Sequence, residues 1–246
     1  MKLIITGATG NAGSGILAAA LASPQITQVT LLSRRPVPTS HPKLSTILLP
    51  SAEHPSGFDA CPTDLVEKLR GHTGVIWALG ISQTQVSKEE YVKITHDYTM
   101  SFVKGLSTLG TPSQPFKFIF ISGEGADQSE KARTLFGNIK GRTEKEIRLS
   151  ETEGFRTVSV RPGGIIPIVE HRPEMSFLMR TGLPALGAVF RAVYPSMVIN
   201  SADLGTATVR MATSDWGWDL KTEEGWIGNG RLVAALAAAK HAQQDI

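Results

Sequence analysis

Three glycines at three-residue intervals are the strongest chemical signal in the chain. Residues 6–13 read Thr-Gly-Ala-Thr-Gly-Asn-Ala-Gly, directly after a short apolar run and before an Ala/Leu-rich segment. In a strand–turn–helix unit this spacing suits a dinucleotide, because the glycines permit a tight turn, a close backbone approach to the pyrophosphate and close helix packing. The first helical turn adds free N–H groups for phosphate oxygens. The residues expected to hold the pyrophosphate are Gly7, Thr9, Gly10, Asn11, Ala12 and Gly13.

Two adjacent arginines, Arg34 and Arg35, end the second apolar run. A site that prefers NAD usually has an acidic residue here, which binds the ribose 2′-hydroxyl. No acid is present at this place, and the two guanidinium groups suit a 2′-phosphate instead. The sequence therefore predicts NADP(H) as the cofactor, with solvated surface arginines as the alternative interpretation.

Further candidate residues stand at the ends of the later predicted strands. Leu79 and Gly80 end the fourth strand, Ser122 follows the fifth, and Pro162 and Gly163 follow the sixth. Ligands of open α/β sheets bind at the carboxyl ends of the strands. A proline with a fixed φ and a glycine without a side chain also leave room for a ring. We expect these residues to contact the cofactor or substrate at this edge of the sheet; the alternative is that they are ordinary turn residues.

Short apolar strands alternate with longer helical segments over the first two thirds of the chain. The predicted strands are residues 3–6, 29–32, 47–49, 75–79, 116–121 and 157–160. The predicted helices are residues 12–22, 63–70, 87–109 with Ser87 as N-cap, 130–153, a helix from 202 with Ser201 as N-cap, and 231–242. This alternation predicts a Rossmann-like, doubly wound parallel sheet with helices on both faces. Residues 1–246 are expected to form one domain, in which the Pro-, Gly- and apolar-rich stretch 165–200 is a cap or substrate segment.

The composition excludes several classes of protein and of site. The chain has 246 residues, 41% hydrophobic and 19% charged, so it can bury a core and is not disordered. One cysteine, Cys61, and six dispersed histidines argue against a disulfide framework and a metal site. A net charge of +3 from scattered basic residues gives no nucleic-acid footprint. No apolar stretch suits a membrane span or a signal peptide, so the expected location is the cytoplasm.

Together, these motifs resemble the short-chain dehydrogenase/reductase family in its atypical and extended branches. The most similar group is the Tat-interacting-protein type of NAD(P)-binding oxidoreductase. The residues that carry the resemblance are 6–13, 33–35, 78–80, 121–127, 140–144 and 161–163, and they span about two thirds of the chain. The resemblance implies a Rossmann domain, NADP(H) binding and oxidoreductase chemistry. It also implies that Pro162 and the backbone after it flank the nicotinamide carboxamide.

The resemblance further implies a catalytic serine at Ser122 and a catalytic lysine at Lys140. In the family, a tyrosine four residues before the lysine exchanges a proton with the substrate oxygen, while the lysine binds the ribose and lowers the pKa of the tyrosine. Phe136 occupies this tyrosine position, and a phenyl ring has no proton to give. Loss of a general acid costs about 10²–10⁴-fold in rate, so this departure weakens the expectation of ordinary ketone reduction.

Three explanations of Phe136 remain open. In the first, another residue supplies the proton, and the nearby candidates are Tyr91, Tyr98, His96 and Glu124. In the second, the reaction needs no strong acid, as in the reduction of a conjugated alkene or an isomerisation. In the third, the cofactor is bound without turnover.

From these observations we expect an NADP(H)-dependent oxidoreductase that acts on a small apolar carbonyl or enone. The alternatives are a non-catalytic NADP(H)-binding regulatory protein and a non-redox isomerase or cyclase. The expected partner is a small-molecule substrate, and a homodimer built from the long helices is left open.

Overall fold

The computed structural model describes residues 1–167 and 195–244. Within them, seven parallel strands form one sheet in the order β3-β2-β1-β4-β5-β6-β9. These strands are β1 (Lys2–Thr6), β2 (Gln28–Ser33), β3 (Leu44–Leu48), β4 (Gly74–Trp77), β5 (Phe116–Ile121), β6 (Phe155–Arg161) and β9 (Trp226–Gly228). Two more strands, β7 (Gly164–Ile166) and β8 (Val198–Asn200), form a separate parallel pair. The strand order reverses between β1 and β4, which is where doubly wound sheets bind their ligands.

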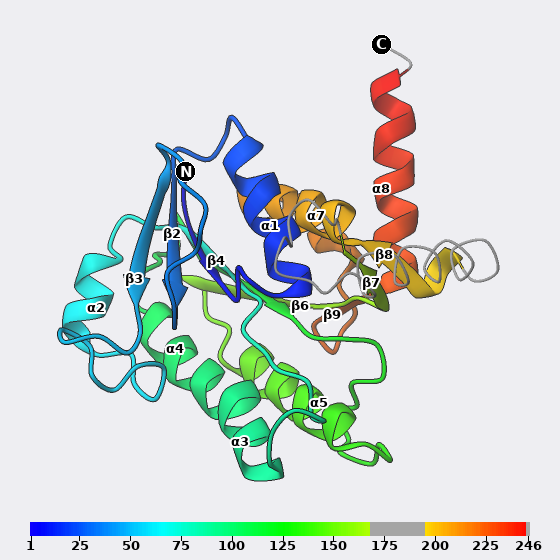
Figure 1. The fold of residues 1–246 in the computed structure, drawn as a ribbon. Helices are drawn as coiled ribbons and strands as arrows, with labels where there is room; N and C mark the ends of the chain where they lie inside the picture. The colour runs from blue at the N-terminus through cyan, green and yellow to red at the C-terminus, as the bar shows by residue number, and fades with distance from the viewer. Residues whose placement is uncertain (168–194, 245–246) are drawn as a thin grey trace.

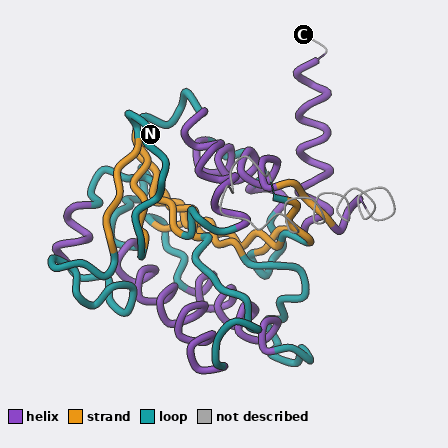
Figure 2. Tube along the Cα trace, viewed as in Figure 1, coloured by secondary structure: helices purple, strands orange, loops and turns teal. Residues whose placement is uncertain are grey.

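Helices cover both faces of the large sheet (Figure 1, Figure 2). One face carries α1 (Asn11–Ala22) and α7 (Ser201–Thr213), while α8 (Asn229–Gln244) starts beside β8 and β9 on the same side and extends away from the sheet. The other carries α2 (Thr63–Lys68), α3 (Lys88–Val92), α4 (Tyr98–Leu106) and α5 (Leu135–Leu149), and the π-helical turn Lys93–Asp97 joins α3 to α4. The predicted Rossmann-like, doubly wound α/β fold is therefore confirmed.

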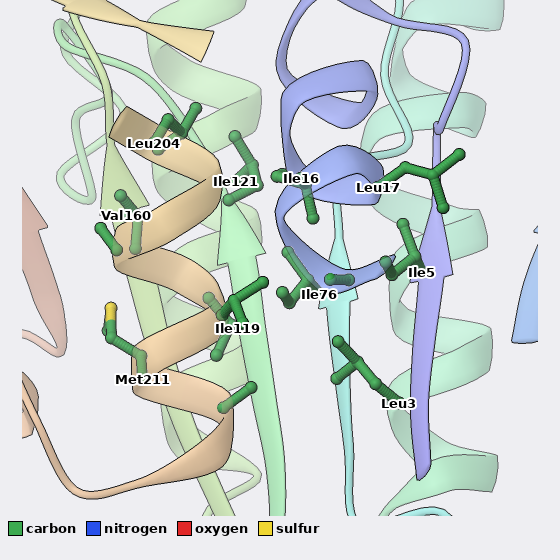
Figure 3. Packing of buried hydrophobic residues seen from close by; sticks show 14 of the residues in the cluster. Leu3, Ile5, Ile16, Leu17, Ile76, Ile119, Ile121, Val160, Leu204 and Met211 are labelled. Carbon is green, nitrogen blue, oxygen red and sulfur yellow. The ribbon is translucent and has the colours of Figure 1, made fainter. Parts of the chain in front are cut away.

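The central strands β1, β2, β4, β5 and β6 are buried on both faces, because successive side chains point into two separate hydrophobic layers, whereas the edge strand β3 is partly exposed. Leu3 and Ile5 of β1 lie in the layer between the sheet and helices α1 and α7, which Figure 3 shows. Ile4, between them in the chain, belongs to the opposite layer with Trp77 and Phe102. Double-sided burial makes each strand a continuous apolar run, and for this reason the sequence reveals the central strands well.

Helices α1 and α7 cross at two glycines. A Cβ placed on Gly15 would lie 2.1 Å from the carbonyl oxygen of Ser201, and one on Gly205 would lie 2.3 Å from the carbonyl oxygen of Gly15. The two backbones are thus in direct contact. This contact fixes the start of α1, and with it the glycine turn, against the C-terminal part of the chain.

Helix α5 is shorter than the predicted segment 130–153. It begins at Leu135, where the Thr134 Oγ1 accepts a hydrogen bond from the Gly137 N–H at 3.1 Å. The residues before it form a turn instead, because the Asp127 carboxylate accepts the backbone N–H groups of Ser129 and Lys131 at 2.9 and 3.0 Å. A side chain that satisfies backbone donors locally competes with the helix, so the expected start at residue 130 is wrong.

Other boundaries differ less. Ser87 caps α3 as predicted, since its Oγ accepts the Glu90 N–H at 3.1 Å, but the helix passes through the π-helical turn and ends at Leu106 rather than 109. Asn200, not Ser201, is the N-cap of α7, and α8 begins at Asn229 rather than 231. The strands predicted at 47–49 and 75–79 lie at Leu44–Leu48 and Gly74–Trp77.

The three-residue strands β7, β8 and β9 are absent from the sequence prediction, because so short a run carries no periodicity. Most of the predicted cap or substrate segment 165–200, namely residues 168–194, lies outside the described residues.

Candidate functional site

The glycine turn between β1 and α1 brings three stretches of backbone into contact. Gly7 has φ +66°, and a Cβ there would lie 2.2 Å from the carbonyl oxygen of Ala78, just after β4. A Cβ on Gly13 would lie 2.0 Å from the carbonyl oxygen of Gly7. Gly10, the N-cap residue of α1, donates its N–H to the Gly7 carbonyl at 2.8 Å. A larger residue at Gly7 or Gly13 would force the turn away from β4 or from the helix.

Thr6 locks the same turn to the end of β4. Its buried Oγ1 accepts the backbone N–H groups of Ala78 and Leu79 at 3.1 and 3.0 Å. The two hydrogen bonds join the carboxyl ends of neighbouring strands at the topological switch point. Thr6 is therefore a positioning residue. Its place as the first residue of the glycine motif is the only feature of the sequence that points to this role.

A first cavity lies along this edge of the sheet. Its described lining residues are Gly7, Thr9, Gly10, Leu32, Ser33, Arg34, Arg35, Phe58, Ala78, Leu79 and Gly80. The structure thus brings together most of the residues that the sequence assigned to the pyrophosphate and 2′-phosphate. Both arginines are exposed and form no ion pair with any described residue, so their guanidinium groups are available to an anion.

Asn11, Ala12 and Gly13 do not line this cavity, and form the first turn of α1 behind it. The Asn11 Nδ2 donates to the carbonyl oxygen of Ile165 at 2.9 Å, which connects α1 to β7. Its Oδ1 is buried without a hydrogen-bond partner in the described part of the chain. The Asn11 side chain therefore links α1 to β7 and does not line this cavity.

A second cavity, of about 710 Å³, lies beyond the ends of β5 and β6. Its described lining residues are Ser122, Gly123, Glu124, Phe136, Pro162, Gly163, Gly164, Ile165, Ser196, Met197 and Gly230. Ser122, Pro162 and Gly163 were expected here from the sequence. The Ser122 Oγ is buried and has no hydrogen-bond partner among the described residues. A buried hydroxyl without a partner costs free energy, so this group suits a bound polar atom.

Lys140 on α5 lies close to residues of both cavities and lines neither of them. Its buried Nζ donates to the carbonyl oxygen of Ile121 at 2.8 Å and lies 4.5 Å from the centre of the Phe120 ring. A Cβ on Gly80 of the first cavity would lie 3.9 Å from this nitrogen. Burial lowers the pKa of Lys140 to about 8, against the opposing attraction of Glu144.

Phe136 lies one turn before Lys140 on α5 and lines the second cavity. Its ring packs against Gly123, where an added Cβ would come within 2.7 Å of the ring. Its backbone N–H donates to the Gln83 Oε1 at 2.8 Å, which ties the loop after β4 to the start of α5. Phe136 thus occupies the position expected of a proton donor and presents only carbon and hydrogen.

Of the four substitute proton donors suggested by the sequence, only Glu124 lines this cavity. Tyr91 is buried elsewhere, and burial raises the pKa of its hydroxyl. The ring of Tyr98 stacks on Phe58 at 5.9 Å. Both ring nitrogens of His96 lie within 3.0 Å of carboxylate oxygens at the junction with α5. These three side chains therefore do not line the second cavity, and their contacts lie elsewhere in the fold.

Asn229, at the start of α8, is a residue that the sequence did not single out for the site. It is fully buried; its Oδ1 accepts the Gly163 N–H at 3.0 Å and its Nδ2 donates to the Ser196 carbonyl at 2.6 Å. Its own backbone N–H donates to the Glu124 Oε1 at 2.8 Å. One asparagine thus joins three walls of the second cavity. No local pattern marks it, because its partners are far away in the chain.

A buried ion pair supports the same region. The Arg161 guanidinium binds the Glu144 carboxylate through two nitrogens, with Nε–Oε1 and Nη2–Oε2 distances of 2.9 and 2.6 Å. It also lies 4.1 Å from the centre of the Trp226 ring. The pair connects the end of β6 to α5, one turn after Lys140, and so fixes the helix that carries Lys140 and Phe136.

The described residues contain no group of three or more His, Cys, Asp or Glu side chains that could hold a metal ion. Burial raises the pKa of the Cys61 thiol to about 12, so a thiolate nucleophile does not form there at neutral pH. Among the described helices, none has both the length and the hydropathy required to cross a bilayer.

Solved structures share this architecture over nearly the whole chain. A short-chain dehydrogenase from Burkholderia cenocepacia J2315 in complex with NADP has a TM-score of 0.63 at 14% identity, covering 99% of this chain and 95% of that one. Aldohexose dehydrogenase from Thermoplasma acidophilum gives 0.66 at 14% identity, over 92% and 91% of the two chains. The fold is that of the short-chain dehydrogenases. At such identities the similarity establishes the fold and nothing finer.

The sequence relatives have names that state no reaction. Protein fmp52, mitochondrial, from Emericella nidulans is 28% identical over 217 residues, 85% of each chain. Leucinostatins biosynthesis cluster protein T from Purpureocillium lilacinum is 26% identical over 186 residues, which are 76% of this chain and 65% of that protein. This chain thus matches less than two thirds of that relative's length. No family model matches the chain.

The comparison corrects one expectation. FMP52 proteins from Emericella nidulans, Eremothecium gossypii and Kluyveromyces lactis are all named as mitochondrial. The predicted cytoplasmic location is therefore wrong. It rested on the lack of an apolar leader or span, and such a lack says little about how a protein reaches an organelle.

Proposed function

We propose that this protein is an NADP(H)-dependent oxidoreductase of the atypical short-chain dehydrogenase type. The observation that carries the proposal is the placement of Lys140: its buried amine lies beside Gly80 of the first cavity and is bonded to Ile121, next to Ser122 of the second. A dinucleotide along this edge would have its phosphates at the glycine turn and its nicotinamide near Ser122. The short-chain dehydrogenase from Burkholderia cenocepacia, which has a similar fold, is a complex with NADP, and this supports a nicotinamide cofactor.

The residues present fit such a cofactor. Gly7, Thr9 and Gly10 would hold the pyrophosphate, together with the first turn of α1, while Arg34 and Arg35 would bind a 2′-phosphate. Lys140 would donate hydrogen bonds to the nicotinamide ribose, and Pro162 and Gly163 would flank the nicotinamide ring. When bound, the cofactor supplies or accepts a hydride.

On the substrate side, the described lining of the second cavity contains two serines, Ser122 and Ser196, and no tyrosine. The unpartnered Ser122 Oγ is free to hydrogen-bond the polar atom of a small apolar substrate, for which a carbonyl or enone was expected from the sequence. Phe136 cannot deliver a proton there. The proton that a carbonyl oxygen requires must then come from water or from Glu124, or the substrate must not require one.

A second candidate function is an NADP(H)-binding protein without turnover, and the observation that favours it is Phe136. The two candidates differ in one result. An oxidoreductase consumes NADPH with some small apolar carbonyl or enone and loses that activity with Ser122→Ala, whereas a binding protein shows only cofactor affinity. From the names of the FMP52 relatives we also propose a mitochondrial location, which subcellular fractionation tests.

The first experiment compares thermal unfolding of the protein alone, with NADPH and with NADH. At a ligand concentration about 100 times the dissociation constant, binding adds about 2.7 kcal/mol, which raises the midpoint by about 5–11 °C for a chain of this size. We expect this shift with NADPH and a much smaller one with NADH. The double variant Arg34→Ala/Arg35→Ala should abolish the difference, while Arg70→Ala, an exposed arginine paired with Glu67, should preserve it. No shift with either cofactor refutes the proposal.

A further inference from the structure

The second cavity has an uneven distribution of charge. Among its described lining residues Glu124 is the only charged one, and most of the others offer carbon or backbone. Glu124 forms no ion pair with any described residue, and its side chain is exposed. An apolar cavity with a single unpaired carboxylate favours a ligand that is apolar and positively charged.

The Glu124 carboxylate is held in a defined place. Its Oε1 accepts the Asn229 backbone N–H at 2.8 Å, and the Glu124 N–H donates to the Pro162 carbonyl at 2.9 Å. Asn229 is itself fixed by its hydrogen bonds to Gly163 and Ser196. The negative charge is therefore anchored to the cavity wall at the end of β6, and a bound cation would not have to order it first.

An aromatic ring lies in the same cavity. Phe136 is half-buried and lines the cavity together with Glu124 and Ser122. The face of an aromatic ring attracts an organic cation, and the attraction grows when ligand and ring are withdrawn from water. Phe136, unable to donate a proton, is thus able to stabilise a positive charge.

We propose that the second cavity binds an organic cation, and that the substrate of the proposed reductase is an iminium ion on an apolar ring. The proposal rests on the proposed function for its redox part. The iminium carbon accepts a hydride, the π electron pair of the C=N bond moves to nitrogen, and the product is a neutral amine beside an oxidised nicotinamide. No proton is transferred, so the reaction does not require the tyrosine hydroxyl that is missing at Phe136.

The two buried basic side chains described near this cavity do not oppose the binding, and the first of them, Arg161, is paired with Glu144. Lys140 is not among the residues that line the second cavity, because its amine is bonded to the Ile121 carbonyl on the side of Gly80. The unpartnered Ser122 Oγ also suits such a ligand. A hydroxyl can accept a hydrogen bond from an iminium N–H, just as it can donate one to a carbonyl oxygen.

The test begins with binding, which requires no turnover. The probe is N-methyl-3,4-dihydroisoquinolinium, a permanent cation, and its comparison is the uncharged carbon isostere 3-methyl-1,2-dihydronaphthalene. Calorimetric titration of the full chain without cofactor, so that the positively charged ring of NADP⁺ does not repel the probe, should give an affinity about ten-fold or more higher for the cation, the factor that corresponds to about 1.4 kcal/mol. Equal affinities would overturn the proposal.

Glu124→Gln then isolates the carboxylate. The amide oxygen keeps an acceptor for the Asn229 N–H, so the variant should fold, and its unfolding midpoint checks this. We expect it to lose the preference for the cation, while Glu223→Gln, which removes another exposed carboxylate, keeps it. A preference that survives Glu124→Gln would show that another group recognises the charge and would refute the assignment.

A kinetic comparison completes the test. NADPH oxidation with the iminium probe should be about 100-fold or more faster than with 1-tetralone, the low end of what a missing general acid costs the ketone. Phe136→Tyr restores a donor and should raise the ketone-to-iminium rate ratio. If 1-tetralone reacts as fast as the probe, the substrate class is wrong. If NADPH causes no thermal shift, the proposed function itself fails, and the binding experiment without NADP⁺ still decides on the cation site.

Discussion

Replacing Lys140 with methionine tests whether the amine at the centre of the site is as buried as the structure has it. Burial lowers the pKa of Lys140 from 10.5 to about 8. Because a ten-fold change in proton affinity corresponds to about 1.4 kcal/mol, this lowering corresponds to about 3 kcal/mol of folding free energy. Below pH 8 the folded state carries that full cost, since the amine is charged in both states. Between pH 8 and 10.5 the unfolded chain binds the proton and the folded chain does not, so stability rises with pH there.

The measurement is urea unfolding of the wild type and Lys140→Met from pH 7 to pH 10.5, followed by tryptophan fluorescence. The difference in unfolding free energy, wild type minus variant, should increase by about 3 kcal/mol over this interval. Lys104→Met, which removes an exposed lysine on α4, should give a difference that hardly changes with pH. If Lys140→Met behaves like Lys104→Met, the amine reaches water in the folded protein, and the position assigned to it between the cavities is refuted.

Three further variants test the supports of the site. Gly15→Ala places a Cβ 2.1 Å from the Ser201 carbonyl oxygen, so α1 and α7 must separate, and we expect a loss of about 1–3 kcal/mol in thermal or urea unfolding. Glu144→Gln breaks the buried pair with Arg161 and should cost about 3–5 kcal/mol, measured the same way; an effect below about 1 kcal/mol would contradict its burial. Thr6→Val leaves two N–H groups after β4 without an acceptor and should cost about 1–3 kcal/mol and weaken NADPH binding in a fluorescence titration.

The parts of the site that the sequence predicted are those defined by local chain geometry. Gly7 and Gly10 line the first cavity because a strand–turn–helix unit fixes their relation within a few residues. Ser122 and Gly80 lie at the same sheet edge because parallel strands end together. For the same reason the order of strands and helices could be predicted from apolar runs and turn residues.

The parts that it missed depend on contacts between distant segments. Asn229 forms hydrogen bonds with Gly163, 66 positions away in the chain, and with Glu124, 105 positions away. The residues next to Asn229 in the sequence give no indication of either partner. The late start of α5 was missed for another reason. An aspartate carboxylate such as that of Asp127 can accept backbone N–H groups either at the start of a helix or within a turn. Here it accepts those of Ser129 and Lys131 and forms a turn.

The burial of Lys140 bears directly on whether this site binds a cofactor. Its charge is unfavourable to folding at neutral pH, and Phe136 leaves no tyrosine one turn away for that charge to act on. In the function proposed above, the amine donates hydrogen bonds to the nicotinamide ribose beside Gly80. Lys140→Met should then be more stable than the wild type at pH 7 and yet show a smaller midpoint shift with NADPH, the trade-off typical of a binding group held in an unfavourable place. A variant that is less stable but binds NADPH as well would instead make Lys140 a structural residue, anchored to Ile121 for the sake of the fold.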